Sequence, residues 1–243
     1  YPFSLAELEN KFSRFDLSAK LGGFLTHGLY PAVVLADTAG RTLFLQNLAG
    51  NYLYKDILMF ENLRRSDMLN DLLKLLALQI GAEVSMRELA VKLKCGVKTV
   101  ERYLDLLEKS FVIFRLRPFS RNLRNEIGKK IKVFFYDVGV RNAIIDRFAD
   151  LDVRDDVGGL WENFCVLERM KFNQKQEQVC NSYFWRDHTG KEVDYVEEQN
   201  GKITAFEFKW RGVKYRPPTE FLRAYNVNEI KIINQDNLAG FIL

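Results

Sequence analysis

Two acidic residues and a lysine in the C-terminal third of the chain have the spacing of a metal-dependent hydrolytic site. Asp194 lies shortly before the dipeptide Asn200-Gly201, and Glu207 and Lys209 lie shortly after it. Both flanking segments are rich in β-branched and aromatic residues. Because Asn and Gly tolerate positive φ at the two positions of a tight turn, we expect a β-hairpin here.

The turn determines which residues face each other across this hairpin. With the Asn-Gly dipeptide as the turn, cross-strand partners have numbers that sum to 401, so Asp194 lies opposite Glu207 and Glu192 lies opposite Lys209. Side chains alternate along a strand, which predicts that these four residues share one face. The other face is expected to take four apolar residues: Val193, Tyr195, Phe206 and Phe208.

Two carboxylates that face each other at about 5 Å repel unless a cation lies between them. Mg²⁺ suits such a position because it binds a few carboxylate oxygens together with water. We therefore predict that Asp194 and Glu207 are metal ligands. Lys209 is predicted to be catalytic by orienting an attacking water, whose pKa the metal would lower. The alternative is a solvated face without a metal, on which Glu192 and Lys209 form a minor surface pair.

The surrounding pattern predicts an α/β protein of several domains. In the C-terminal segment, 158–243, the pair Gly158-Gly159 precedes a helix, and the order of elements reads αβββαβ. Apart from the hairpin strands, the expected helices and strands are 160–173, 182–187, 217–225 and 229–234.

The middle segment, 66–157, has the pattern of a winged helix-turn-helix. A helix over 66–80 is followed by a second helix that begins with a capping box at Ser85 and Glu88, and by a third helix over about 98–109. A short turn that contains glycine joins the second and third helices, as in a helix-turn-helix.

A hairpin of residues 111–117 and 132–136 is the expected wing. Residues at the start of the third helix would face bases, and basic residues of the wing would contact phosphates. The predicted DNA-binding residues are Lys98, Thr99, Arg102, Arg121, Arg124, Lys129 and Lys130. A winged helix that serves as a protein-interaction module or a spacer is the alternative.

The first segment, 1–65, reads as short helices that break at the pair Gly22-Gly23 and again at Gly28. It contains no residues whose spacing indicates chemistry. The chain begins at Tyr1 rather than at a methionine, which suggests a fragment of a longer protein.

Composition limits the class of protein further. The chain has 243 residues, 47% of them apolar and 28% charged, as in folded proteins. Its net charge of +4 is compatible with nucleic-acid binding without requiring it. Three scattered cysteines and two histidines argue against a zinc site or a disulfide framework. With no apolar run of ~18 residues and no signal peptide, we expect a cytoplasmic protein without a membrane partner.

The C-terminal order of elements, with Asp194 on one strand and Glu207-Phe208-Lys209 on the next, resembles the PD-(D/E)XK nuclease superfamily. In that superfamily the first helix often supplies another acid. The resemblance therefore implies Glu162 as a third metal ligand, and Glu168 is a weaker match.

Motifs over most of the chain resemble the C-terminal portion of a bacterial and archaeal AAA-type ATPase family. They are YPFSLAEL (1–8), GLYP (28–31), YKDI (54–57), FYDVG (135–139), YFWR (183–186) and EVD (192–194). In that family an ATPase core precedes a winged helix and a nuclease-like region. The resemblance implies that 1–65 is a helical remnant of the ATPase core and lid, 66–157 the winged helix and 158–243 the nuclease-like domain.

The chain lacks the GxxxxGK[ST] phosphate-binding loop, so ATP would bind only in a preceding ATPase core, which is itself an expected partner. The resemblance and the site together predict a Mg²⁺-dependent module that acts on DNA. A non-catalytic regulatory or docking role for the nuclease-like fold is the alternative. The oligomeric state is left open by the sequence.

Overall fold

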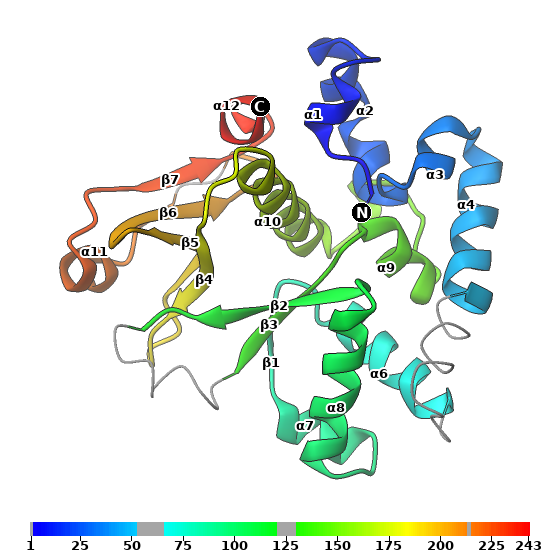
Figure 1. The fold of residues 1–243 in the computed structure, drawn as a ribbon, viewed down its shortest axis with the longest axis horizontal. Helices are drawn as coiled ribbons and strands as arrows, with labels where there is room; N and C mark the ends of the chain where they lie inside the picture. Colours follow the sequence, from blue (N-terminus) through cyan, green and yellow to red (C-terminus); the bar gives the residue numbers. More distant parts are fainter. Residues whose placement is uncertain (1, 53–65, 121–129, 213–214) are drawn as a thin grey trace.

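A computed structural model of the protein describes residues 2–52, 66–120, 130–212 and 215–243. These residues form an α/β fold around a mixed sheet of seven strands, in the order β1-β3-β2-β4-β5-β6-β7 (Figure 1). The α/β class expected from the sequence is thereby confirmed. The strands are β1 (Glu83–Val84), β2 (Ile113–Pro118), β3 (Ile131–Phe135), β4 (Asn181–Arg186), β5 (Glu192–Gln199), β6 (Lys202–Phe208) and β7 (Ile230–Ile233).

Short helices form the N-terminal part, as expected. Ser4 and Ser13 cap the first two of them by accepting hydrogen bonds from backbone N–H groups, and Pro31 begins the third. The helices are α1 (Leu5–Leu8), α2 (Arg14–His27), α3 (Pro31–Leu35) and α4 (Thr38–Asn47), with a π-helical turn at Leu48–Tyr52. The expected break at Gly22-Gly23 is wrong, because α2 continues through both glycines to Gly28, whose φ is 73°.

Three helices and the first three strands form the middle part. They are α6 (Ser66–Leu78), α7 (Met86–Lys92) and α8 (Val97–Lys109), and their apolar faces pack on one face of β2 and β3. The expected antiparallel hairpin is confirmed by the pairing of β2 with β3. The short strand β1 and the helix α9 (Val138–Ile144), whose N-terminus Asp137 caps, were not predicted.

The sheet continues from the middle part into the C-terminal part through a parallel pairing of β2 with β4. Arg117 and Pro118 lie opposite Tyr183 and Phe184, and the Phe119 N–H donates to the Phe184 carbonyl at 2.6 Å. One apolar cluster contains side chains from β3, β5 and β6 together. The hairpin and the C-terminal strands therefore share a core across the predicted border at 157/158.

Helices cover both faces of the C-terminal strands (Figure 1). Helix α10 (Val157–Lys175) packs Trp161 and Phe164 on one face, where α12 (Leu238–Ile242) joins it. Helix α11 (Thr219–Tyr225) packs Phe221 on the other face. The pair Gly158-Gly159 was expected to precede the first of these helices, but it lies inside the first turn of α10.

The register predicted for the β5–β6 hairpin is confirmed over its paired residues. The partners run from Gln199 opposite Lys202 to Tyr195 opposite Phe206, and every pair sums to 401. Asn200 and Gly201 have φ values of 52° and 79°, as the tight turn requires.

The expected alternation fails at one place in β5, where a β-bulge interrupts its pairing with β4. Tyr183 lies opposite Val196, whereas Trp185 lies opposite Val193, so three steps along β5 match two along β4. Val193 consequently packs with Phe221 on the face opposite to Tyr195. Its predicted place beside Tyr195 is wrong.

No helix within the described residues combines the length and the apolar character that crossing a bilayer requires.

Candidate metal centre

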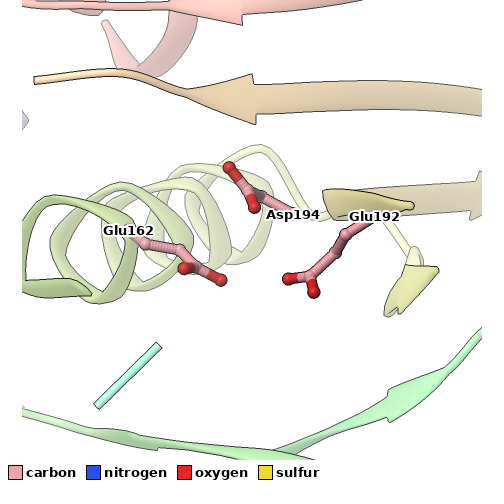
Figure 2. A group of neighbouring side chains, drawn as sticks. All are labelled: Glu162, Glu192 and Asp194. Atoms are coloured by element: carbon pink, nitrogen blue, oxygen red, sulfur yellow. The ribbon is translucent and has the colours of Figure 1, made fainter. Parts of the chain in front are cut away.

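Three carboxylates converge where α10 faces β5. Glu162 comes from the helix, and Glu192 and Asp194 come from the strand; one oxygen of each lies within 4.8 Å of the others (Figure 2). Glu162 is 8% exposed, and the side chain of Asp194 is 13% exposed. A compact set of carboxylate oxygens is the kind of site that hard divalent cations such as Mg²⁺ bind.

Helix α10 is held in place by contacts on both sides of Glu162. The side chain of Asn163 accepts a hydrogen bond from the Phe135 N–H at 2.7 Å and donates to the Phe135 carbonyl at 2.8 Å. Trp161 is fully buried in the core below the helix. A Cβ atom at Gly159 would lie 2.6 Å from the Ile80 carbonyl oxygen, so only glycine allows this approach. These contacts fix the position from which Glu162 reaches the site.

The bulge in β5 determines the directions of its two acidic residues. Asp194 lies one position beyond the last regular β5–β6 pair, and its Oδ2 accepts a hydrogen bond from the Phe208 N–H at 2.9 Å. Glu192 lies at the start of the strand, opposite Arg186 of β4. The bulge falls between Val193 and Val196 and thus includes Asp194, and both carboxylates point toward α10 (Figure 2).

Lys132 is a member of the site that the sequence analysis missed. Its ammonium lies 2.6 Å from Glu162 Oε1 and 3.9 Å from Asp194 Oδ1, and it also forms an ion pair with Glu192. Only 1% of the lysine side chain is exposed. A lysine within the apolar run IKVFF of a strand was the one available signal.

Glu207 and Lys209 form a second pair beside this cluster. Lys209 Nζ lies 2.6 Å from Glu207 Oε1, while Glu207 Oε2 is buried without a hydrogen-bond partner. The regular β5–β6 pairs end at Tyr195 opposite Phe206, so Asp194 and Glu207 each lie one position beyond them. Glu207 is not one of the three converging carboxylates. The predicted pairing of Glu192 with Lys209 is wrong, because Glu192 instead contacts Lys132 and, at 3.3 Å, Arg186.

The site holds more acidic than basic side chains. Among the described residues four carboxylates meet three cations, and one of these cations, Arg186, also lies 3.4 Å from Glu83. The four carboxylates are Glu162, Glu192, Asp194 and Glu207. A further cation could bind to these carboxyl groups in exchange for the protons that their raised pKa values favour.

The pKa values reflect this imbalance. Burial, with the nearby charge of Asp194, raises the pKa of Glu162 to about 8 against the opposing effect of Lys132. Burial and the same aspartate raise the pKa of Glu207 to about 7. Burial alone would favour a neutral Lys132, but the three carboxylates outweigh it and raise the pKa of this lysine. Lys209 is also held protonated, because Glu207 and Asp194 outweigh its burial and raise its pKa.

Glu168 lies outside the cluster. Its buried carboxylate accepts a hydrogen bond from the Leu5 N–H at 2.7 Å and pairs with Lys171 at 2.8 Å. This residue fastens α1 to α10. Of the two acids that the resemblance offered on α10, only Glu162 joins the candidate site.

The predicted DNA-binding residues that the structure describes lie on α8 and at the start of β3. Lys98 and Arg102 are exposed one turn apart on α8, and Thr99 is partly exposed beside them. The exposed Lys130 lies 3.6 Å from Glu83. Arg121, Arg124 and Lys129 lie outside the described residues.

Comparisons with known proteins give two family matches and one relative. The models of two families, each described as a domain of unknown function, match residues 19–151 (DUF8612) and residues 157–238 (DUF4143). An uncharacterized protein of Haemophilus influenzae is 24% identical over 156 residues, which cover 60% of this chain and 39% of the relative. The chain thus spans less than half of the length of this relative. No solved structure matches the chain.

Proposed function

The chain belongs to the family described as a domain of unknown function (DUF8612). We propose that it carries a Mg²⁺-dependent phosphodiesterase site that acts on DNA. The observation that carries the proposal is the convergence of Glu162, Glu192 and Asp194, with one oxygen of each within 4.8 Å of the others. The buried carboxyl group of Glu207, paired with Lys209 and close to the Tyr215 hydroxyl, is a further acidic group whose pKa the charge of Asp194 helps to raise.

The donor set fits Mg²⁺ in its chemistry. Glu162 and Asp194 are the ligands proposed from two different elements, and Glu192 is a third carboxylate within reach. When bound there, Mg²⁺ would neutralise negative charge that develops on a phosphate. The proposed reaction is hydrolysis, in which a water oxygen bonds to phosphorus and the bond from phosphorus to the leaving sugar oxygen breaks.

Lys209 is the proposed catalytic residue. Its side chain is 30% exposed, so its ammonium reaches both the site and solvent, and Glu207 holds it at 2.6 Å. Because its pKa is raised, Lys209 stays protonated and acts as a hydrogen-bond donor rather than as a base. We propose that it orients the attacking water and stabilises charge on the phosphate.

The order of elements supports the nuclease-like part of this proposal. Helix α10, the antiparallel strands β4, β5 and β6, helix α11 and strand β7 follow one another as in the PD-(D/E)XK pattern, and β7 pairs with β6 in parallel. The pattern would assign metal binding to Glu162, Asp194 and Glu207; the first two belong to the carboxylate cluster, and Glu207 is paired with Lys209.

We propose that the middle part of the chain contacts DNA as a winged helix. The order α6-β1-α7-α8-β2-β3 is that of a winged helix-turn-helix, with α8 as the recognition helix. Lys98 and Arg102 are exposed on α8, where they would contact DNA.

We further propose that the chain acts as the C-terminal part of a longer AAA-type ATPase. The sequence motifs that resemble this family support the proposal, and the longer Haemophilus relative is consistent with it. ATP would then bind to the preceding core, which would be the first partner of this chain.

A second candidate function is a non-catalytic regulatory or docking module on the same fold. The observation in its favour is Lys132, which satisfies Glu162 and Glu192 by ion pairs without any metal. In this case the buried charges would serve to join the hairpin to α10.

Calorimetric titration with Mg²⁺ and Mn²⁺, followed by cleavage assays on plasmid and single-stranded DNA, separates the two functions. The phosphodiesterase proposal predicts metal binding at millimolar concentration and metal-dependent cleavage. Lys209→Ala should abolish cleavage while metal binding persists, and Lys231→Ala, at an exposed position of β7, should leave both unchanged. Absence of metal binding at millimolar concentration would favour the non-catalytic module, and unchanged cleavage by Lys209→Ala would remove the catalytic role of this residue.

A further inference from the structure

The ammonium of Lys132 lies where a cation bound by the three carboxylates would lie. It contacts Glu162 at 2.6 Å and Glu192 by an ion pair, and Asp194 Oδ1 lies 3.9 Å away. Lys132 extends into the cluster from β3, whereas Glu162 extends into it from α10. Only 1% of the lysine side chain is exposed. The structure therefore shows the cluster with a cation already in it, supplied by the chain.

A divalent ion and this ammonium cannot share the cluster as it stands. Mg²⁺ would take carboxylate oxygens at about 2.0–2.1 Å, and Lys132 already contacts one oxygen of Glu162 and one of Glu192. A metal ion and the Lys132 ammonium within the same carboxylate cluster, which is largely closed to solvent, would repel each other strongly. Occupation by the metal thus requires that the ammonium moves away.

We propose that Lys132 is an internal competitor for the metal, so that the site exchanges between a lysine-closed state and a metal-binding state. This inference rests on the proposed metal-binding function and adds a means of regulating it. The flexible four-carbon side chain of lysine allows the ammonium to leave by rotation about its own bonds. The competitor therefore lowers metal affinity without blocking the site permanently.

The competing side chain and the carboxylates come from different elements. Lys132 lies on β3, in the hairpin that packs against α6, α7 and α8, whereas the carboxylates lie on α10 and β5. Asn163 of α10 holds Phe135 of the same strand by two hydrogen bonds, so the hairpin is fixed against α10. The exchange therefore depends on movement of the Lys132 side chain itself.

Neutral substitutions of Lys132 test this inference. Lys132→Met keeps the length and volume of the side chain but removes the charge, and Lys132→Gln provides a polar neutral variant. Each should bind Mn²⁺ at least about tenfold more tightly than the wild type, because a repelling charge is removed. Lys231→Met, an exposed lysine on β7, is the matched control and should bind Mn²⁺ like the wild type. Calorimetry measures the affinities, and the rise of the melting temperature with Mn²⁺ measures them independently.

The outcomes separate this inference from the proposed function. Tighter binding by both Lys132 variants supports both. Metal binding by the wild type with no gain in either variant overturns the inference and leaves the metal site standing. No binding by any of the proteins overturns both. If the Lys132 variants fold only when Mn²⁺ is added, the metal replaces the lysine as proposed; if they remain unfolded in excess Mn²⁺, the competitor role is rejected.

Discussion

Lys132 Nζ and Glu162 Oε1 lie 2.6 Å apart, although the lysine belongs to β3 and the glutamate to α10. Both side chains are buried, and Lys132 is also paired with Glu192. This contact places the candidate metal centre at the boundary between the β2–β3 hairpin and the C-terminal strands.

Asp194→Asn should reduce the affinity for Mg²⁺ and Mn²⁺ by at least about tenfold, because it removes one charged ligand. The Asn side-chain oxygen can still accept the hydrogen bond that Asp194 receives from the Phe208 N–H, so we expect the fold to be retained. Calorimetry and circular dichroism check both statements. Glu229→Gln, at an exposed position, is the control and should change neither; wild-type metal affinity in Asp194→Asn would contradict its role as a ligand.

The metal-free protein should lose stability as the pH rises through the range in which Glu207 titrates. The pKa of Glu207 is about 7 in the fold against an ordinary value of 4.5, so between these values the folded state holds a proton that the unfolded chain has released. This contribution to stability is fully present below the lower value and is lost as the pH rises through the higher one.

Glu207→Gln isolates this effect because glutamine is neutral at every pH. In buffer with a chelator, the variant should gain about 1 to 3 kcal/mol in free energy of unfolding relative to the wild type between about pH 5 and pH 8. Denaturant titrations at several pH values measure the difference. A difference that does not depend on pH would show that Glu207 is not protonated in the fold.

Gly159→Ala should destabilise the protein by about 1 to 3 kcal/mol, because the new Cβ would lie 2.6 Å from the Ile80 carbonyl oxygen. Gly158→Ala is the matched control in the same turn of α10. A Cβ at Gly158 meets no atom within 4 Å, so this variant should be neutral or gain up to about 1 kcal/mol. Thermal melts of both variants measure the two changes in stability. Equal destabilisation by the two substitutions would exclude a steric cause at Gly159.

Replacement of both Lys98 and Arg102 by glutamate should weaken DNA binding and make its dependence on salt less steep. Each phosphate contact that is lost should change the slope of log K against log salt by roughly one. Fluorescence anisotropy at several salt concentrations gives this slope. Lys175→Glu, at the exposed C-terminal end of α10, should leave the slope nearly unchanged. If the double variant has the wild-type slope, α8 does not contact DNA.

The hairpin that carries Asp194 and Glu207 could be predicted from the sequence because its turn is local. Asn200 and Gly201 determine the register without reference to any other part of the chain, and the pairs from 195 to 206 follow it. The bulge could not be predicted in this way. It arises from the pairing of β5 with β4, and this pairing decides that Glu192 faces α10.

Lys132 could not be recognised as a site residue for a similar reason. In an isolated hairpin the alternation of Ile131, Lys132 and Val133 is that of a strand with one face in solvent. The lysine is buried only because β2 pairs with β4 and α10 covers this face. The neighbours that bury it lie far away in the sequence, and no short-range pattern indicates them.

The parallel pairing of β2 with β4 limits where this chain can be cut into separately soluble pieces. A cut in the connection before α10 would give two pieces, each with a newly bared strand edge that invites association with other chains. Produced alone, either piece is expected to aggregate. When the two pieces are produced together, we expect them to reassociate through this strand pairing. Recovery of soluble protein would be the first evidence of reassociation.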